Sequence, residues 1–156
     1  MIYTASVKTE KLGDANDKRV VMLPVAKGLV YRVEIEFPPG CSGLLSVKIF
    51  DGGYQVWPSN RDGAFRSDGC TIAFDDSYLK QAAPFEFRIE TENIDNSWSH
   101  TINVRLGMAS NEAFMSRYMP SISWEKFQVV LAKASLEQEV LKKAAILQLT
   151  NELREV

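Results

Sequence analysis

Apolar and polar residues alternate most clearly between Leu29 and Phe50, and this stretch organises the predicted fold. Successive side chains of a strand point to opposite faces, so the first half of the stretch has one apolar and one mostly charged face. Pro39-Gly40 then combines a fixed φ with a residue that tolerates positive φ, as a type II turn requires. The pattern predicts a β-hairpin with one face in a core. That face comprises Leu29, Tyr31, Val33, Ile35 and Phe37, followed by Leu45, Val47 and Ile49.

Further short strands are predicted on both sides of this hairpin. Pro24 removes a hydrogen-bond donor from its segment, which therefore favours the edge of a sheet. The region 75–84 is a connection, with a single helical turn expected around Tyr78 and Leu79. In all, about eight strands separated by turn signals are typical of an antiparallel β-sandwich, here with a jelly-roll-like arrangement. The further strands are predicted at 2–9, 19–25, 54–57, 70–74, 85–91 and 98–108.

The pattern changes to a helical one after residue 108, where glycine is absent and Pro120 is the single proline. A short helix over 111–118 is expected behind Ser110 as its N-cap. A second helix is expected from Trp124 to about Arg154, with Ser123 as its N-cap and Ile122 stapled onto Phe127. The sequence therefore predicts a β-sandwich domain over 1–108 and a helical C-terminal extension over 109–156, mainly β overall.

The long helix has two apolar stripes and a favourable Glu139–Lys143 pair. At 1.5 Å per residue it would span about 46 Å, whereas a body of about 120 residues is roughly 35 Å across. It either folds back on its own sandwich or contacts other subunits, and we favour the second. The first stripe is Phe127, Leu131, Ala134, Leu141, Ala145, Leu149 and Leu153; the second is Leu136, Val140, Ala144 and Leu147.

Composition narrows the function classes. The 156 residues suit one domain, and an apolar share of 46% is that of an ordinary globular protein. A net charge of −2 gives no reason to expect nucleic acid. No apolar run approaches the roughly 20 residues that span a bilayer, and the N-terminus does not resemble a signal peptide, so we expect no membrane and cytoplasmic synthesis. Cys41 and Cys70 are expected to be free thiols, although strand pairing could bring them together.

A search for catalytic, cofactor and metal-binding residues predicts none, and so no enzyme. His100 is the single histidine, which excludes sites that need several, and it suits a strand histidine with an ordinary hydrogen bond. A Cys41–His100 dyad is a remote alternative. Loop oxygens at 75–76 or 93–95 could hold Ca²⁺, but no EF-hand pattern accompanies them, and solvated turns explain them better.

Two surfaces suit binding rather than catalysis. The region 58–69 is the longest predicted loop and a natural contact surface, with Arg61, Phe65 and Arg66 as candidate partner-binding residues. Aromatic residues near turns offer a different reading. Tyr54, Trp57 and Trp98 could form a platform that stacks on sugars, or Trp57 and Trp98 could close the ends of the core.

Two runs, EIEFPPGCSGL at 34–44 and GYQVWPSN at 53–60, resemble small virion proteins of tailed bacteriophages, as does NIDNSWSHTI at 93–102. The resemblance covers about residues 30–106 and excludes the long helix. It implies a non-enzymatic β-sandwich that binds other virion subunits.

These observations lead to a hypothesis about function. The chain is expected to be a virion structural protein, with capsid decoration or stabilisation first and a tail or connector component close behind. Its partners would be the major capsid or tail protein and further copies of itself. The partner-binding residues on the helix would be Val140, Ala144 and Leu147. The alternative is a carbohydrate-binding or adhesion module.

Overall fold

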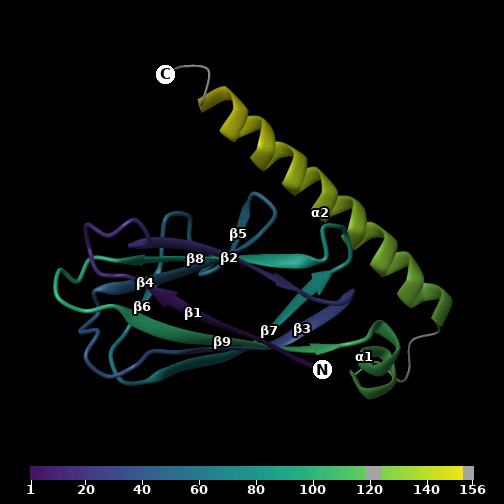
Figure 1. Ribbon diagram of the computed structural model, residues 1–156. Helices are drawn as coiled ribbons and strands as arrows, with labels where there is room; N and C mark the ends of the chain where they lie inside the picture. Colours follow the sequence, from purple (N-terminus) through teal and green to yellow (C-terminus); the bar gives the residue numbers. More distant parts are fainter. Residues whose placement is uncertain (119–123, 153–156) are drawn as a thin grey trace.

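The computed structural model describes residues 1–118 and 124–152, and it is mainly β (Figure 1). Two antiparallel sheets form a sandwich, and a long C-terminal helix follows it. One sheet has four strands in the order β1-β9-β3-β7; the other has the order β2-β8-β4-β5, with β6 also paired to β4. The strands are β1 (Ile2–Thr9), β2 (Lys18–Pro24), β3 (Gly28–Glu36), β4 (Leu45–Asp51), β5 (Tyr54–Trp57), β6 (Phe65–Arg66), β7 (Thr71–Lys80), β8 (Glu86–Asn93) and β9 (His100–Ala109).

The hairpin predicted between Leu29 and Phe50 is wrong, although both of its strands exist. β3 pairs with β7 and β9, whereas β4 pairs with β5, β6 and β8 in the other sheet. The segment 37–44 therefore passes from one sheet to the other. Gly40 does adopt the positive φ expected of it, at 94°. Alternation identified two strands with one buried face each, but it does not say whether two such faces lie in one sheet or oppose each other across the core.

A bulge in β3 corrects the assignment of its first residues. The register shifts between Val30 and Arg32, so Val30 is buried and Tyr31 is exposed. A bulge re-aims the side chains at its position, and Leu29 before it is buried as predicted. After the bulge the prediction is confirmed, because Val33 and Ile35 are fully buried while the glutamates between them are only partly covered.

The core lies between the two sheets and takes the inward residues of both. The alternation predicted for the last two long strands is confirmed: Phe87 and Ile89 in β8 are fully buried. The members that the predictions named are Leu45, Val47 and Ile49 in β4 and Ile102, Val104 and Leu106 in β9. Phe85, expected on the same face as Phe87, precedes the strand and is exposed.

One strand end agrees with its prediction, and two predicted connections contain strand residues. β2 is an edge strand that finishes at Pro24, as expected. The helical turn around Tyr78 and Leu79 is wrong, since β7 continues through both to Lys80. The loop at 58–69 contains the short strand β6, which pairs with Ser46 and Val47 of β4.

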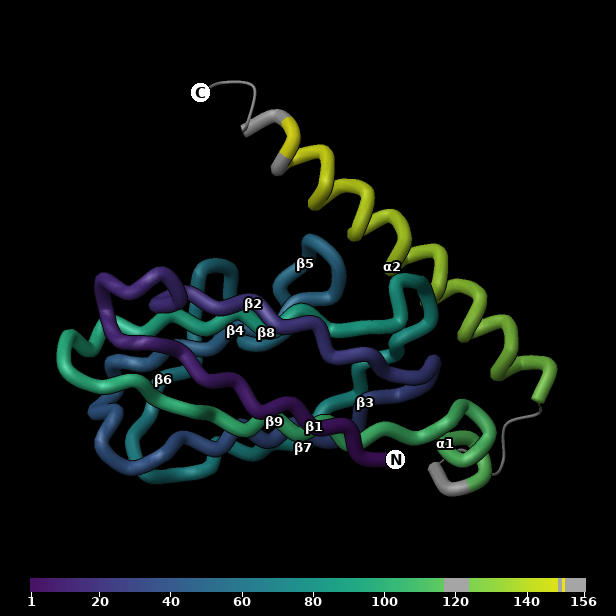
Figure 2. Tube along the Cα trace, in the orientation of Figure 1, coloured from purple at the N-terminus to yellow at the C-terminus, as the bar shows by residue number. Residues whose placement is uncertain are grey.

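Two helices follow the sandwich: α1 (Asn111–Tyr118) and α2 (Trp124–Glu152). The Ser110 cap is confirmed, because its Oγ accepts a hydrogen bond from the Ala113 amide at 3.2 Å. The expected Ser123 cap and Ile122 staple lie outside the described residues. Figure 2 shows α2 crossing the body obliquely and projecting beyond it. The Glu139–Lys143 pair is present at 4.0 Å.

Candidate functional site

The face of α2 that meets the body begins with apolar residues and has polar residues at its centre. Gln138 accepts a hydrogen bond from the Gln81 amide at 3.0 Å through Oε1, and its Nε2 donates to the Leu79 carbonyl. One turn later, Lys142 donates to the carbonyls of Ala82 at 3.0 Å and Ala83 at 3.3 Å. These bonds fix α2 on the segment that connects β7 to β8.

A buried ionic cluster completes this attachment. Asp51 Oδ1 lies 2.8 Å from Lys142 Nζ and 2.5 Å from Lys80 Nζ, while Oδ2 accepts from the Tyr78 hydroxyl at 2.9 Å. Asp51 and Lys80 have no exposed side-chain surface. Burial lowers the pKa of Lys80 to about 8, against the opposing effect of Asp51. Burial and the Asp51 carboxylate raise the pKa of Tyr78 above its ordinary value, which keeps its hydroxyl a donor.

The opposite face of α2 is apolar and exposed. Val129, Leu136, Val140 and Leu147 are 70%, 65%, 65% and 62% exposed. Each lies two residues after a residue that faces the body, which is about 200° around the helix. Surface helices normally turn their apolar stripe inward and their charges outward. Around Gln138 and Lys142 this arrangement is inverted, whereas Phe127 and Leu131 keep it. We call the four exposed residues the outer stripe.

The two predicted stripes of α2 differ in burial: the first is partly buried and the second is exposed. In the first, Phe127 is buried and Leu131, Ala134 and Ala145 are half-buried, but Leu141 is 48% exposed. Gln138 and Lys142 occupy the centre of the inward face, which leaves Leu141 at its margin. The side chain of Leu149 and all of Leu153 lie outside the described part of the chain. Every member of the second stripe, Leu136, Val140, Ala144 and Leu147, is exposed.

The sequence analysis missed Asp51, Lys80, Gln138 and Lys142. A signal for two of them was present, since Gln138 and Lys142 are four residues apart within the helical face that contains Phe127 and Ala134. Polar residues in such a row indicate a polar contact in the interface. Nothing in the local sequence marks Asp51 in its Asp-Gly-Gly turn as their partner.

A cleft of about 440 Å³ lies between α2 and the β4–β5 hairpin. Tyr54, Arg61 and Asp62 line it from the sandwich, and Ala145 lines it from the helix. Gln55 orders the loop on its rim, where its Nε2 donates to the carbonyls of three loop residues: Pro58, Asn60 and Gly63. The cleft thus brings one predicted loop residue, Arg61, beside the C-terminal half of α2.

The other two predicted loop residues have structural partners. Phe65 is half-buried and packs on Phe74 with ring centroids 5.8 Å apart. Arg66 is exposed and donates to the Gly43 carbonyl at 3.3 Å. Neither lines the cleft, so the loop does not present its three candidate residues as one surface there.

The three aromatic residues proposed for sugar stacking do not form a platform. Trp57 is 2% exposed, its ring packs on Tyr78 and Phe87, and its indole N–H donates to Asp76 at 2.6 Å. Of the two alternatives for Trp57, a sugar platform or a core residue, the structure shows the core residue. Trp98 is 71% exposed on the β8–β9 loop, so it does not close the core, and Tyr54 stands alone on the cleft.

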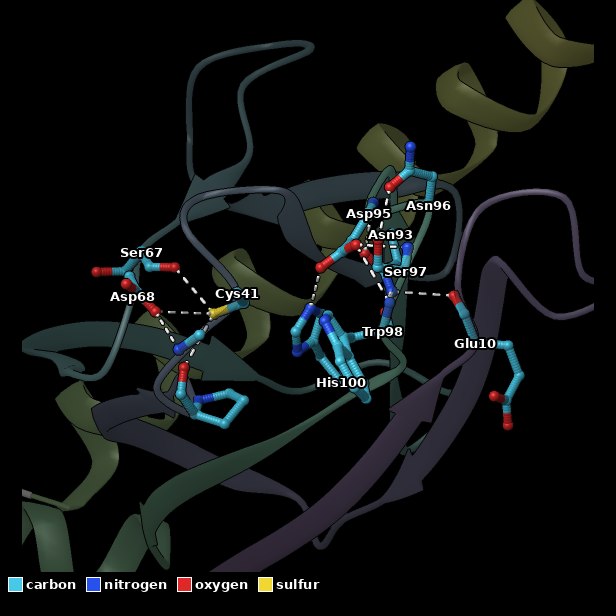
Figure 3. A network of polar contacts seen from close by, with 12 residues as sticks. Glu10, Cys41, Ser67, Asp68, Asn93, Asp95, Asn96, Ser97, Trp98 and His100 are labelled. Atoms are coloured by element: carbon cyan, nitrogen blue, oxygen red, sulfur yellow. Dashed lines mark hydrogen bonds and ion pairs between the residues drawn. The ribbon is translucent and has the colours of Figure 1, made fainter.

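The β8–β9 loop is held by a buried polar network (Figure 3). Asp95 accepts from the Ser97 amide at 2.7 Å and contacts His100 Nε2 at 2.9 Å. The hydrogen bond from the Ser97 backbone N–H is the main cause that lowers the pKa of Asp95, and the hydrogen bond with His100 lowers it further. Asn93 Nδ2 donates to the Trp98 carbonyl at 2.9 Å. His100 thus has the ordinary strand hydrogen bond that was expected of it.

The Cys41–His100 dyad is wrong, because each group is engaged elsewhere. The buried Cys41 thiol donates to the carbonyls of Pro38 at 3.0 Å and Ser67 at 3.2 Å (Figure 3). Burial is the main cause that raises the pKa of the Cys41 thiol, and the nearby Asp68 carboxylate raises it further. The reactive thiolate is therefore disfavoured. Cys41 and the exposed Cys70 are both free thiols, as expected.

Asp75 and Asp76, expected in a solvated turn, lie in β7 and have protein partners. Asp75 pairs with Arg32 at 2.9 Å, and Asp76 accepts from Trp57. Within residues 1–118 and 124–152, no group of three or more His, Cys, Asp or Glu side chains is placed to hold a metal ion. No helix in those same ranges is long and apolar enough to cross a membrane.

Comparison with known proteins gives no family. No family model and no curated protein matches the chain. Among solved structures, the crystal structure of FlhE is similar at 11% identity and a TM-score of 0.33, over 68% of this chain and 96% of that one. Values this low assign neither fold nor function to the present chain.

Proposed function

We propose that this protein is a non-enzymatic structural component of a tailed-phage virion. Its first role is capsid decoration or stabilisation, and a tail or connector position is the second. It binds neighbouring subunits through α2 and the loop after β5. The resemblance of residues 30–106 to small virion proteins supplies the biological setting of this proposal.

The inverted helix carries the proposal. A helix whose apolar residues served its own domain would place them on the sandwich, yet α2 places Gln138 and Lys142 there and Leu136 and Val140 in solvent. Contiguous exposed apolar surface on a soluble protein marks an interaction site. Burying the outer stripe would contribute roughly 4–8 kcal/mol per copy, taking about 1.5–3 kcal/mol for each fully buried side chain and two-thirds of that here.

The experiment is to quantify the chain in purified phage particles and to test reattachment. Particles should contain it in a fixed, high copy number, and particles that lack it should recover it from solution. The double variant Val140→Glu with Leu147→Glu should stay folded by circular dichroism and fail to reattach. Leu12→Glu with Ile94→Glu is the matched control, because it also charges two exposed apolar residues, away from the helix. Absence of the chain from particles would refute the proposal.

The cleft keeps one alternative in view, a carbohydrate-binding module. An aromatic ring flanked by polar side chains is a common sugar site, and Tyr54 lies beside Gln55, Arg61 and Asp62. A glycan array would test this, with Tyr54→Ala as the variant that abolishes binding. A positive array that Tyr54→Ala leaves unchanged would place any glycan elsewhere on the surface.

A further inference from the structure

The outer stripe of α2 lies within a longer stretch of helix whose sequence is nearly palindromic in residue class. Residues 128–148 read QVVLAKASLE, then Gln138, then EVLKKAAILQ, and the second run repeats the residue classes of the first in reverse order. The apolar stripe itself has spacings of seven, four and seven residues. The matched pairs include Val129 with Leu147, Ala132 with Ala144, Lys133 with Lys143, Leu136 with Val140, and Glu137 with Glu139.

The two mismatched pairs lie towards the body. They are Ala134 with Lys142 and Ser135 with Leu141, and all but Leu141 belong to the side of α2 that faces the sandwich. Lys142 differs because it binds Asp51. Gln138, the centre of the sequence symmetry, also faces the body, where it bonds the segment after β7. Apart from Leu141, which is exposed at the margin, the symmetry therefore holds on the exposed side of the helix and is broken where the helix contacts the sandwich.

A sequence that reads alike in both directions fits one occupant in particular. In a two-fold dimer, residue i of one copy contacts residue j of the other, and j contacts i. When two such helices run antiparallel about residue 138, each residue of the outer stripe meets an apolar residue of the same stripe in the other copy. A partner of unrelated sequence would give no reason for this symmetry.

We propose that α2 pairs antiparallel with α2 of a second copy of this chain, about a two-fold axis that passes beside Gln138. Val129 then packs on Leu147 of the other copy, and Leu136 packs on Val140. The lysines at 133 and 143 lie at the outer layers, where their long stems cover the apolar seam and their charges reach water. Their pairs within one helix, with Glu137 at 3.9 Å and Glu139 at 4.0 Å, are exposed and do not compete with the dimer.

The inference rests on the proposed function, because it names the partner of the same helix surface. It leaves the loop after β5 and the rest of the sandwich for contact with another virion protein. The building block that joins the particle would then be a dimer, with the two sandwiches on opposite sides of a central helix pair.

Sedimentation velocity of the full chain tests the assembly state, and spin labels test the direction of pairing. We expect twice the 17.5 kDa of one chain. Val140→Glu with Leu147→Glu should raise the dissociation constant at least 100-fold, as should Leu136→Glu alone, while Leu12→Glu with Ile94→Glu should leave it unchanged. Labels at Gln128→Cys or Gln148→Cys, each in a Cys70→Ser chain, should both give about 30 Å, which is 20 residues at 1.5 Å.

Three results would overturn the inference: a monomer at all concentrations, a dimer that survives both helix variants, or label distances below about 20 Å, which a parallel pair of helices 8–10 Å apart would give. A monomer that reattaches to particles through α2 would leave the proposed function standing. A dimer in solution, together with absence of the chain from particles, would leave the pairing of α2 standing and refute the proposed virion function.

Discussion

Lys142 of α2 and Asp51 at the end of β4 lie 2.8 Å apart, between Nζ and Oδ1, in the interior of the molecule. Since Lys80 binds the same carboxylate oxygen, one acid balances two bases, and the helix is attached to the body through a buried charge. Such a contact stabilises little by itself but is costly to break, because the remaining partner stays buried without a counter-charge.

Replacing Asp51 by alanine is therefore expected to lower the free energy of unfolding by roughly 3–5 kcal/mol, since two buried ammonium groups lose their acceptor. Lys142→Met should lower it less, by about 1.5–3 kcal/mol, because Lys80 still pairs with Asp51. Urea titration measures both values. Equal losses would mean that Lys80 contributes nothing to the cluster.

The contribution of Lys80 to stability should rise with pH between about 8 and 10. Burial lowers the pKa of Lys80 to about 8 in the folded chain, from an ordinary value of 10.5. Within this window Lys80 binds more protons in the unfolded chain than in the folded one, so its contribution to the free energy of unfolding increases with pH, while the raised pKa values of Cys41 and Tyr78 act in the opposite direction in both the parent chain and a Lys80 variant. Urea midpoints at pH 7, 8, 9 and 10 measure the effect. Lys80→Met is the control, and a rise of the same size in that variant would assign it to another group.

Substitutions in β3 should differ sharply in their stability cost, depending on whether the side chain points into the core or towards solvent. Ile35→Ala or Val33→Ala should cost roughly 2–4 kcal/mol, because both side chains are fully buried and leave a cavity. Glu34→Ala should cost about 1 kcal/mol or less, as should Glu36→Ala, which loses a surface pair with Arg105 and a long hydrogen bond from Asn103. Guanidinium melts compare the two sets, and the assignment fails if the glutamate variants are the less stable ones.

The loop after β5 should divide into a structural and a contact part. Phe65→Ala should cost about 1–3 kcal/mol, since its ring packs on Phe74. Arg61→Ala with Arg66→Ala should keep the melting temperature within a few degrees and weaken attachment to particles. Thermal melts and co-sedimentation measure these effects. Replacement of the whole segment 61–66 by a Gly/Ser linker would remove β6 and is expected to destabilise the fold.

The two thiols should react at very different rates. Cys70 is exposed, whereas Cys41 is buried with a raised pKa. A thiol reagent at pH 8 should modify one cysteine per chain in the native state and two in denaturant. Mass spectrometry identifies the modified residue, and rapid native labelling of Cys41 would show that the segment 37–44 opens in solution.

The sequence predicted strands more reliably than their partners. Period-two alternation follows from strand geometry, so the buried faces of β4, β8 and β9 could be read directly. The placement of β3 and β4 in different sheets could not be predicted. The same turn residues suit a hairpin within one sheet and an arch that passes from one sheet to the other. The bulge at Val30–Arg32 was equally hidden, since no glycine or proline marks it.

The site was predictable in outline only. The apolar residues of α2 were identified, and the exposure of the second predicted stripe agrees with the expectation that only one stripe packs on the sandwich. The attachment of α2 to the body was not, because it depends on charges from β4 and β7 that come together only in the folded chain. Trp57 kept two readings, a sugar platform or a core residue, for a related reason: its acceptor, Asp76, is distant in sequence.

The pairing of β1 with β9 sets the order in which the protein can form during synthesis. Ile2 lies opposite Gly107, so the first strand of its sheet has no partner until about 100 further residues have been made. At 5–20 residues per second, a ribosome needs roughly 5–20 s for that interval. Throughout it, β1 is an unpaired edge on a nascent chain, open to proteases and chaperones. The four-stranded sheet can be completed only after β9 has left the exit tunnel.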